Sequence, residues 1–313
     1  GGYEVIGVSD INPAIKDEFS NCFYSANWKE VIDTCNPDVV FVCTFNNVIP
    51  EIVCYSLDKG MDVFSEKPPG KTVEDVLMMQ KAENKSGKIL KFGFNHRFHY
   101  AIMEAKAMID SGRFGKMLWV RGTYGKAGGN QFEGNWRSDK ELSGGGILLD
   151  QGIHMLDLLR YFLGDFKEIK SFVENSYWKN IDLEDNAFAL MKTVDGKVAM
   201  MHSSATQWKH KFHLDLYLEE GYITIDGILS STRSYGEECV TFARREFEDQ
   251  ASAFGKPREQ KIYFDKDDSW KLEIEDFYNA ISGKEKLKMG TSLDALRVME
   301  MVYGIYDAAK ADK

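Results

Sequence analysis

The sequence predicts a parallel α/β sheet followed by an α+β domain with a large open antiparallel sheet. Three observations support this fold class. Strand-like and helix-like segments alternate over residues 1–95, strand-like segments then follow one another from 116 to 226, and two amphipathic helical patterns close the chain. Alternating elements are typical of parallel sheets, and consecutive strands are typical of antiparallel sheets.

The first part carries apolar segments that we expect to be strands, at residues 5–8, 39–43, 62–65 and 89–94. Helical patterns lie between them, at residues 28–34, 50–59 and 73–85. Because these strands are almost continuously apolar, both faces of their sheet should be covered.

The second part should begin with a helix at residues 98–111. One antiparallel sheet is then expected from strands at residues 116–124, 169–177, 186–193, 197–205, 212–218 and 222–226. Alternating apolar residues from Phe212 to Leu218 predict one buried face for that sheet. Closing helices are expected at residues 270–281 and 293–309. We divide the chain into domains at 1–96 and 97–313, with the C-terminal helix packing back on the first domain.

Composition limits the classes of function. With 313 residues and 43% hydrophobic residues, the chain can bury a large core. The net charge of −10 argues against nucleic acid or an anionic membrane as partner. Apolar runs are far shorter than the roughly 20 residues that span a bilayer. The five cysteines are odd in number and lack CxxC spacing, which predicts reduced thiols and a cytoplasmic protein.

A glycine run, Gly144 to Gly146, opens an apolar helical segment that carries Asp150, His154 and Asp157. These ionisable residues are spaced i, i+4 and i+7, so a regular α-helix places them on one face. A carboxylate one turn before a histidine can fix its tautomer, which suits proton transfer. Two other interpretations stay open: a mutually satisfied core pair, and a metal site. We disfavour the metal site because no second Cys/His cluster completes a coordination shell.

Lys67 lies in Glu66-Lys67-Pro68-Pro69, directly after the expected strand at residues 62–65. The carboxyl ends of parallel strands are where α/β sheets bind ligands. A partly desolvated lysine there would have a lowered pKa and would share a proton with a hydroxyl or carbonyl group. The alternative is a solvated lysine in a turn.

Taken together, Glu-Lys-Pro and the later Gly-Gly-Gly-x3-Asp-x3-His resemble the glucose-fructose oxidoreductase/inositol dehydrogenase (Gfo/Idh/MocA) family. The order of further short motifs strengthens the resemblance, namely Asp10, Thr44, Asn46, Asn95, Arg97 and Trp136-Arg137. The resemblance implies an NAD(P)-binding Rossmann domain followed by an open-sheet domain. It also implies an oxidoreductase that acts on a hydroxyl carbon of a sugar, nucleotide-linked sugar or cyclitol, assembled as a homodimer or homotetramer.

The resemblance also assigns site residues. Lys67, Asp150 and His154 would be catalytic: His154 takes the hydroxyl proton, Asp150 orients the imidazole and Lys67 stabilises charge on oxygen, with the choice of Lys67 or His154 as formal base left open. The cofactor would contact Asp10, Ile11, Thr44, Asn46, Glu66, Lys67, Asn95, Arg97, Trp136 and Arg137. The substrate would contact Lys67, Tyr124, Arg137, Asp150, His154 and Trp208. Asp10 would bind ribose hydroxyls and favour NAD over NADP, unless it serves as a helix cap.

The sequence departs from the family pattern in two places. Phe45 and Ile49 stand where the family commonly has Pro and His, which affects contacts on the nicotinamide side. The family's first strand and its Gly-x-Gly-x-x-Gly turn have no counterpart before Asp10, so we expect an N-terminally incomplete Rossmann sheet with two unpaired edges and a cleft between them. The alternative functions are therefore a non-catalytic nucleotide- or sugar-sensing relative, or an inactive truncated fragment.

Overall fold

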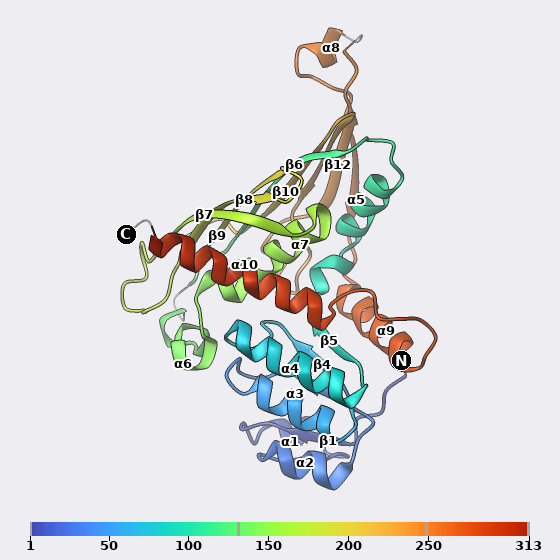
Figure 1. Ribbon diagram of the computed structural model, residues 1–313, viewed down its shortest axis with the longest axis vertical. Helices are drawn as coiled ribbons and strands as arrows, with labels where there is room; N and C mark the ends of the chain where they lie inside the picture. Colours follow the sequence, from blue (N-terminus) through green and yellow to red (C-terminus); the bar gives the residue numbers. More distant parts are fainter. Residues whose placement is uncertain (1, 130–131, 248–249, 312–313) are drawn as a thin grey trace.

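The computed structural model describes residues 2–129, 132–247 and 250–311. Figure 1 shows a lower part of short parallel strands with helices beside them, and an upper part dominated by one broad sheet. The long C-terminal helix α10 (Ser292–Ala311) lies where the two parts meet and packs against both α4 and β7.

The lower part contains two small parallel sheets rather than one. The first pairs β1 (Gly7–Ser9) with β2 (Phe23–Ser25), and the second has the order β3 (Val39–Val42), β4 (Asp62–Glu66), β5 (Leu90–Gly93). The helices of this part are α1 (Ile15–Glu18), α2 (Trp28–Cys35), α3 (Ile49–Asp58) and α4 (Val73–Ser86).

Local sequence explains where these helices begin and end. The Asn27 side chain caps α2, and Thr72 forms a reciprocal capping box with Asp75 at the start of α4. Gly87, at φ 68°, ends α4 in the left-handed conformation that glycine adopts without strain.

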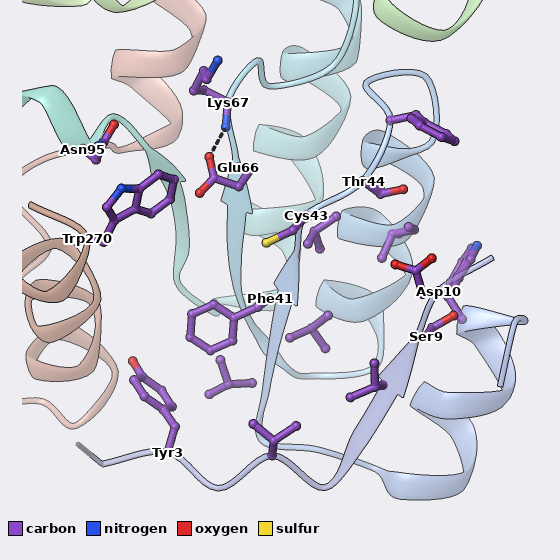
Figure 2. Close-up of a pocket in the computed structure, with 18 of the residues that line it drawn as sticks. Tyr3, Ser9, Asp10, Phe41, Cys43, Thr44, Glu66, Lys67, Asn95 and Trp270 are labelled. Atoms are coloured by element: carbon purple, nitrogen blue, oxygen red, sulfur yellow. Dashed lines mark hydrogen bonds between the residues drawn. The ribbon is translucent and has the colours of Figure 1, made fainter. Parts of the chain in front are cut away.

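Strands β1 and β3 are not paired with each other, and both border one cavity (Figure 2). The two unpaired edges and the cleft predicted from the sequence are therefore present. Apolar side chains at this cleft stay partly accessible, including Val5 at 54%, Ile6 at 42% and Phe41 at 40% exposure.

The upper part is an eight-stranded sheet in the order β13-β12-β11-β10-β6-β9-β8-β7. Its strands are β6 (Met117–Gly125), β7 (Phe166–Glu174), β8 (Asn186–Thr193), β9 (Val198–Ser204), β10 (Lys211–Leu218), β11 (Gly221–Asp226), β12 (Glu238–Arg244) and β13 (Gln260–Phe264). The prediction of a purely antiparallel sheet was wrong at one pair, because β6 and β9 run parallel. Strands β2, β12 and β13 were not predicted from the sequence. Strand β2 has three residues, and most of β13 is exposed, so neither has a strong apolar pattern.

One face of this sheet is covered by α5 (Tyr100–Asp110), α7 (Ile153–Leu163) and α10. Helix α9 (Ser269–Ile281) packs against the 3₁₀ turn η1 (Asn95–Phe98). The remaining short elements are η2 (Phe132–Gly134), η3 (Trp136–Ser138), α6 (Lys140–Ser143) and α8 (Gln250–Ala253). The other face of the sheet displays apolar side chains to solvent from Leu118, Phe172, Phe188, Leu190, Val198 and Met200.

Candidate active site

The segment before α7 is a π-helical turn, η4 (Leu148–Gly152), rather than regular α-helix. Such turns are often found at functional sites. Of the three ionisable residues predicted to share one face, Asp150 and His154 border the cavity, whereas Asp157 does not.

The glycine run before η4 allows the backbone at Glu184 to lie close to it. A Cβ on Gly146 would lie 2.2 Å from the backbone oxygen of Glu184, which is too close for any side chain. The Glu184 carboxylate accepts hydrogen bonds from the backbone N–H groups of Gly146 and Leu148, each at 3.0 Å. Glu184 therefore holds the start of η4, a role that the sequence analysis did not identify.

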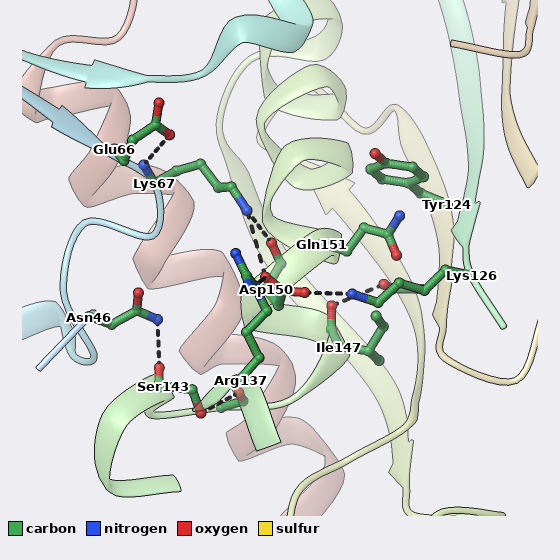
Figure 3. Close-up of polar contacts among 12 residues, drawn as sticks. Asn46, Glu66, Lys67, Tyr124, Lys126, Arg137, Ser143, Ile147, Asp150 and Gln151 are labelled. Carbon is green, nitrogen blue, oxygen red and sulfur yellow. Dashed lines mark hydrogen bonds and ion pairs between the residues drawn. The ribbon is translucent and has the colours of Figure 1, made fainter. Parts of the chain in front are cut away.

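Lys67 follows β4 and reaches across to η4 (Figure 3). Its Nζ donates to the backbone oxygen of Asp150 at 2.7 Å and lies 3.8 Å from the Asp150 Oδ1. Burial lowers the pKa of Lys67; Asp150 and Glu66 oppose the shift, whereas Arg137 and Lys126 add to it. The lower and upper parts of the molecule are therefore joined at the residues predicted to be catalytic.

The Asp150 carboxylate is bound by several cations. Lys126 Nζ lies 2.8 Å from Oδ2, and Arg137 Nε lies 3.1 Å from Oδ1. Burial would raise the pKa of Asp150, but Lys126, Lys67 and Arg137 together hold it well below its ordinary value. Lys126 was not among the predicted site residues, because nothing in the local sequence indicates that the end of β6 meets η4.

The predicted pairing of Asp150 with His154 is not found. No hydrogen bond joins them within the described chain, and the Asp150 carboxylate is directed to the cations instead. The His154 ring stacks on His96, with centroids 3.7 Å apart and planes at 17°. Burial, and then the electrostatic interactions with Lys67 and His99, lower the pKa of His154 well below its ordinary value.

Arg97 lies outside the cavity, in contrast to its predicted contact with the cofactor. Its guanidinium group donates to both oxygens of Asp157, at 2.7 and 2.5 Å, and to Asp294 at 3.4 Å. Arg97 is 4% exposed and Asp157 is fully buried. Since a buried carboxylate requires a partner, Asp157 pairs with Arg97 and ties η1 to α7.

The other predicted cofactor residues border a single cavity of about 2140 Å³, namely Asp10, Ile11, Thr44, Asn46, Glu66, Asn95, Trp136 and Arg137. Ordinary ligand pockets hold roughly 300–1,000 Å³. This cavity is larger because it combines the cleft between β1 and β3 with the space between the two parts of the molecule. The carboxyl ends of β1, β3 and β4 all open into it, as expected for a dinucleotide site.

Several of these side chains already have protein partners. Asp10 Oδ1 accepts from the backbone N–H of Asn12 at 2.7 Å, a local turn that leaves its other carboxylate oxygen for a ligand. Asn46 donates to the backbone oxygen of Ser143 at 2.8 Å and so joins the two parts of the molecule.

The predicted substrate residues divide into two groups. Tyr124 borders the cavity, where its hydroxyl lies 3.1 Å from His96 Nε2. Trp208 does not border it; the residue is 61% exposed and its ring makes a T-shaped contact with Tyr177. Trp208 thus has no contact with the cavity that holds Lys67 and His154.

Across residues 2–129, 132–247 and 250–311, no group of three or more His, Cys, Asp or Glu side chains is arranged to hold a metal ion. The described part of the chain also contains no helix long and apolar enough to cross a bilayer.

Comparison with known proteins agrees with the fold and with the cavity at the strand ends. A family model described as an NAD-binding Rossmann-fold oxidoreductase family matches residues 1–94, which defines the class of protein. The Gfo/Idh/MocA C-terminal domain model matches residues 102–224. The chain belongs to the Gfo/Idh/MocA family, as the motifs predicted.

Similar proteins act on carbohydrates and cyclitols. The chain is 32% identical over 166 residues to D-glucoside 3-dehydrogenase of Escherichia coli K12, covering 53% of this chain and 47% of the relative. It is 27% identical over 209 residues to myo-inositol 2-dehydrogenase of Thermotoga maritima, covering 65% and 60%. A structure of levoglucosan dehydrogenase in complex with NADH and levoglucosan matches with a TM-score of 0.84 at 21% identity, covering 98% of this chain and 88% of that one.

The chain spans about half the length of several curated relatives that it matches. The likeness to the levoglucosan dehydrogenase structure establishes the shared fold alone.

Proposed function

We propose that the protein is an NAD-dependent dehydrogenase that transfers a hydride between nicotinamide and a hydroxyl carbon of a sugar, nucleotide-linked sugar or cyclitol. The observation that carries the proposal is the meeting of Lys67 from the parallel-sheet part with Asp150 from the upper part, beside His154, at the edge of one cavity. A reaction that joins a cofactor to a substrate needs groups from both sides of such a cleft.

The residues around the cavity fit NAD. The strand ends supply Asp10 for the ribose hydroxyls, and Thr44, Asn95, Trp136 and Arg137 surround the remaining space. A carboxylate at Asp10 would repel a 2′-phosphate, which favours NAD over NADP. NAD, when bound, supplies the acceptor for the hydride.

The chain's own groups would manage the proton. His154, held unprotonated by its surroundings, accepts the hydroxyl proton at the cavity edge. Lys67, with its lowered pKa, donates a hydrogen bond to the same oxygen and stabilises its developing charge. Asp150 acts by holding Lys67 and Arg137 rather than by orienting the imidazole. Comparison of the Lys67→Met and His154→Ala variants tests this division of roles.

The quaternary structure is also a proposal. The open sheet face displays Phe172 at 66%, Leu190 at 51% and Phe188 at 44% exposure. A contiguous apolar face of this kind suits a second copy of the chain, in a homodimer or homotetramer. Leu190→Lys should shift the protein toward the monomer in light scattering; an unchanged mass would exclude this face as the contact.

Two further assignments are proposed with the function. We propose that the chain has two domains, at residues 1–96 and 97–313. All five cysteines are free thiols, which supports a reducing, cytoplasmic location. Cell fractionation would test the location.

The experiment is NADH formation by the protein with NAD and a panel of glucosides, free sugars and cyclitols. At least one substrate should be oxidised, and Lys67→Met should lower kcat by about 10²-fold or more. Lys71→Met is the matched control, because Lys71 Nζ also donates to a backbone oxygen, that of Glu141, but outside the cavity. NAD binding without turnover on the whole panel would favour the alternative, a non-catalytic sensing relative.

A further inference from the structure

His96 and His154 form a face-to-face pair of buried imidazoles. Their centroids are 3.7 Å apart, their planes differ by 17°, and each residue is 6% exposed. His96 belongs to η1 and His154 to α7, so the pair also joins two elements that border the cavity.

Both nitrogens of His96 are engaged. Nδ1 lies 3.1 Å from Asn95 Oδ1, and Nε2 lies 3.1 Å from the Tyr124 hydroxyl. The Asn95 amide nitrogen donates to Ser269 at 3.2 Å, which identifies its oxygen as the acceptor. His96 Nδ1 therefore donates to Asn95, and Nε2 shares a hydrogen bond with the Tyr124 hydroxyl. Both ring nitrogens of His96 therefore have partners within the protein.

His154 differs from its stacking partner. Its Nδ1 is buried and has no hydrogen-bond partner in the described chain, although the residue borders the cavity. Of the two stacked rings, His154 is thus the one whose nitrogens are not both committed within the protein.

We propose that His96 is a positioning residue: its flat ring holds the plane of the His154 ring by stacking and keeps water from that face, so that His154 remains an unprotonated base. This inference rests on the proposed role of His154. It predicts that the flat ring of His96, rather than its hydrogen bonds, keeps the pKa of His154 low.

Charged groups around the stacked pair also affect the pKa of His96. Lys67 comes from the end of β4, and His99 lies 5.5 Å from His96 with its Nδ1 2.8 Å from Glu238. The Asp150 carboxylate on η4 is directed to cations. Burial, followed by His154, His99 and Lys67, lowers the pKa of His96 well below its ordinary value.

Two substitutions separate the ring from its hydrogen bonds. His96→Phe keeps a flat ring and loses both polar contacts, whereas His96→Gln keeps polar atoms and loses the ring. The control is His202→Gln, since His202 also stacks on an aromatic ring, that of Phe188 at 4.1 Å and 12°, but on the sheet and outside the cavity.

The readout is the titration of the His154 ring protons by NMR in the cofactor-free protein, with His154→Ala to assign the signal. His96→Gln should raise the His154 pKa by about one unit or more, toward the ordinary value near 6.5, because water reaches the exposed ring face. His96→Phe and His202→Gln should leave it unraised. An unchanged His154 pKa in His96→Gln would overturn the proposal, and so would a rise in His96→Phe equal to that in His96→Gln. If one variant does not fold, the His154 pKa in the other decides the question.

Kinetics supply a second reading. The acid limb of kcat/KM should move to higher pH in His96→Gln and stay in place in His96→Phe. Because the NMR titration needs no turnover, it tests His96 even if no sugar or cyclitol is oxidised. Failure of the proposed function and failure of this inference are therefore separate outcomes.

Discussion

Replacing Arg97 tests whether it is structural, as its position indicates, or a cofactor ligand, as its motif predicts. Arg97→Gln removes two charge-assisted bonds to Asp157 and one to Asp294. Asp157, which is fully buried, is then left without its cation. Breaking a buried pair from one side costs about 3–5 kcal/mol, so we expect a loss of this size in the free energy of unfolding.

Urea denaturation followed by circular dichroism measures the loss, and fluorescence titration measures NADH affinity in the folded variant. The control is Arg297→Gln, whose partner Glu300 lies at 2.8 Å in a half-exposed pair on α10. It should cost no more than about 1 kcal/mol. A stable Arg97→Gln protein with tenfold weaker NADH binding would refute the structural role.

Three further predictions concern other ionisable groups. Hydrogen bonds to Asp215 and Asp226 raise the pKa of His213 to about 9, so its stabilising contribution is complete below about pH 6.5 and is lost as pH rises toward 9. His213→Gln should remove about 1–3 kcal/mol of this pH-dependent stability in urea titrations. Parallel curves of unfolding free energy against pH for the two proteins would contradict this prediction. Burial raises the pKa of Glu273 well above its ordinary value, and both its carboxylate oxygens lack hydrogen-bond partners in the described chain. Glu273→Gln should therefore be more stable than the wild type at neutral pH and lose that advantage near about pH 4. A variant that is less stable at neutral pH would contradict this and indicate that the carboxylate has a partner in solution. Asp10→Ser should reduce the preference for NAD over NADP by about tenfold or more in kcat/KM, and an unchanged ratio would leave Asp10 as a turn residue only.

The sequence was sufficient to predict features that depend on local pattern. The parallel strands and the position of Lys67 after β4 follow from apolar runs that end in polar residues, and parallel strands bring those ends to one edge. The prediction of a cleft between β1 and β3 is confirmed, because it needed strand order alone.

Contacts between distant segments were not predictable. Arg97 meets Asp157 and Asp294, 60 and 197 residues away, and no local signal distinguishes these partners from a ligand. The Asp150 carboxylate meets Lys126 and Arg137 instead of His154, and both cations come from segments outside the helix whose spacing was read. The stacking of His96 on His154 depends on the packing of η1 against α7, which the single motif around Asn95 does not encode.

The most direct test of the account is the kinetics of His154→Ala with NAD and a turned-over sugar or cyclitol. Removing a general base typically costs about 10²–10⁴ in rate, so kcat should fall by at least about 100-fold. The affinity for NAD should be nearly unchanged, since His154 lies on α7 and not at the strand ends. The thermal midpoint, measured on the same samples, separates loss of chemistry from loss of folding. A folded His154→Ala enzyme with wild-type kcat would contradict the assignment and leave Lys67 as the proton acceptor.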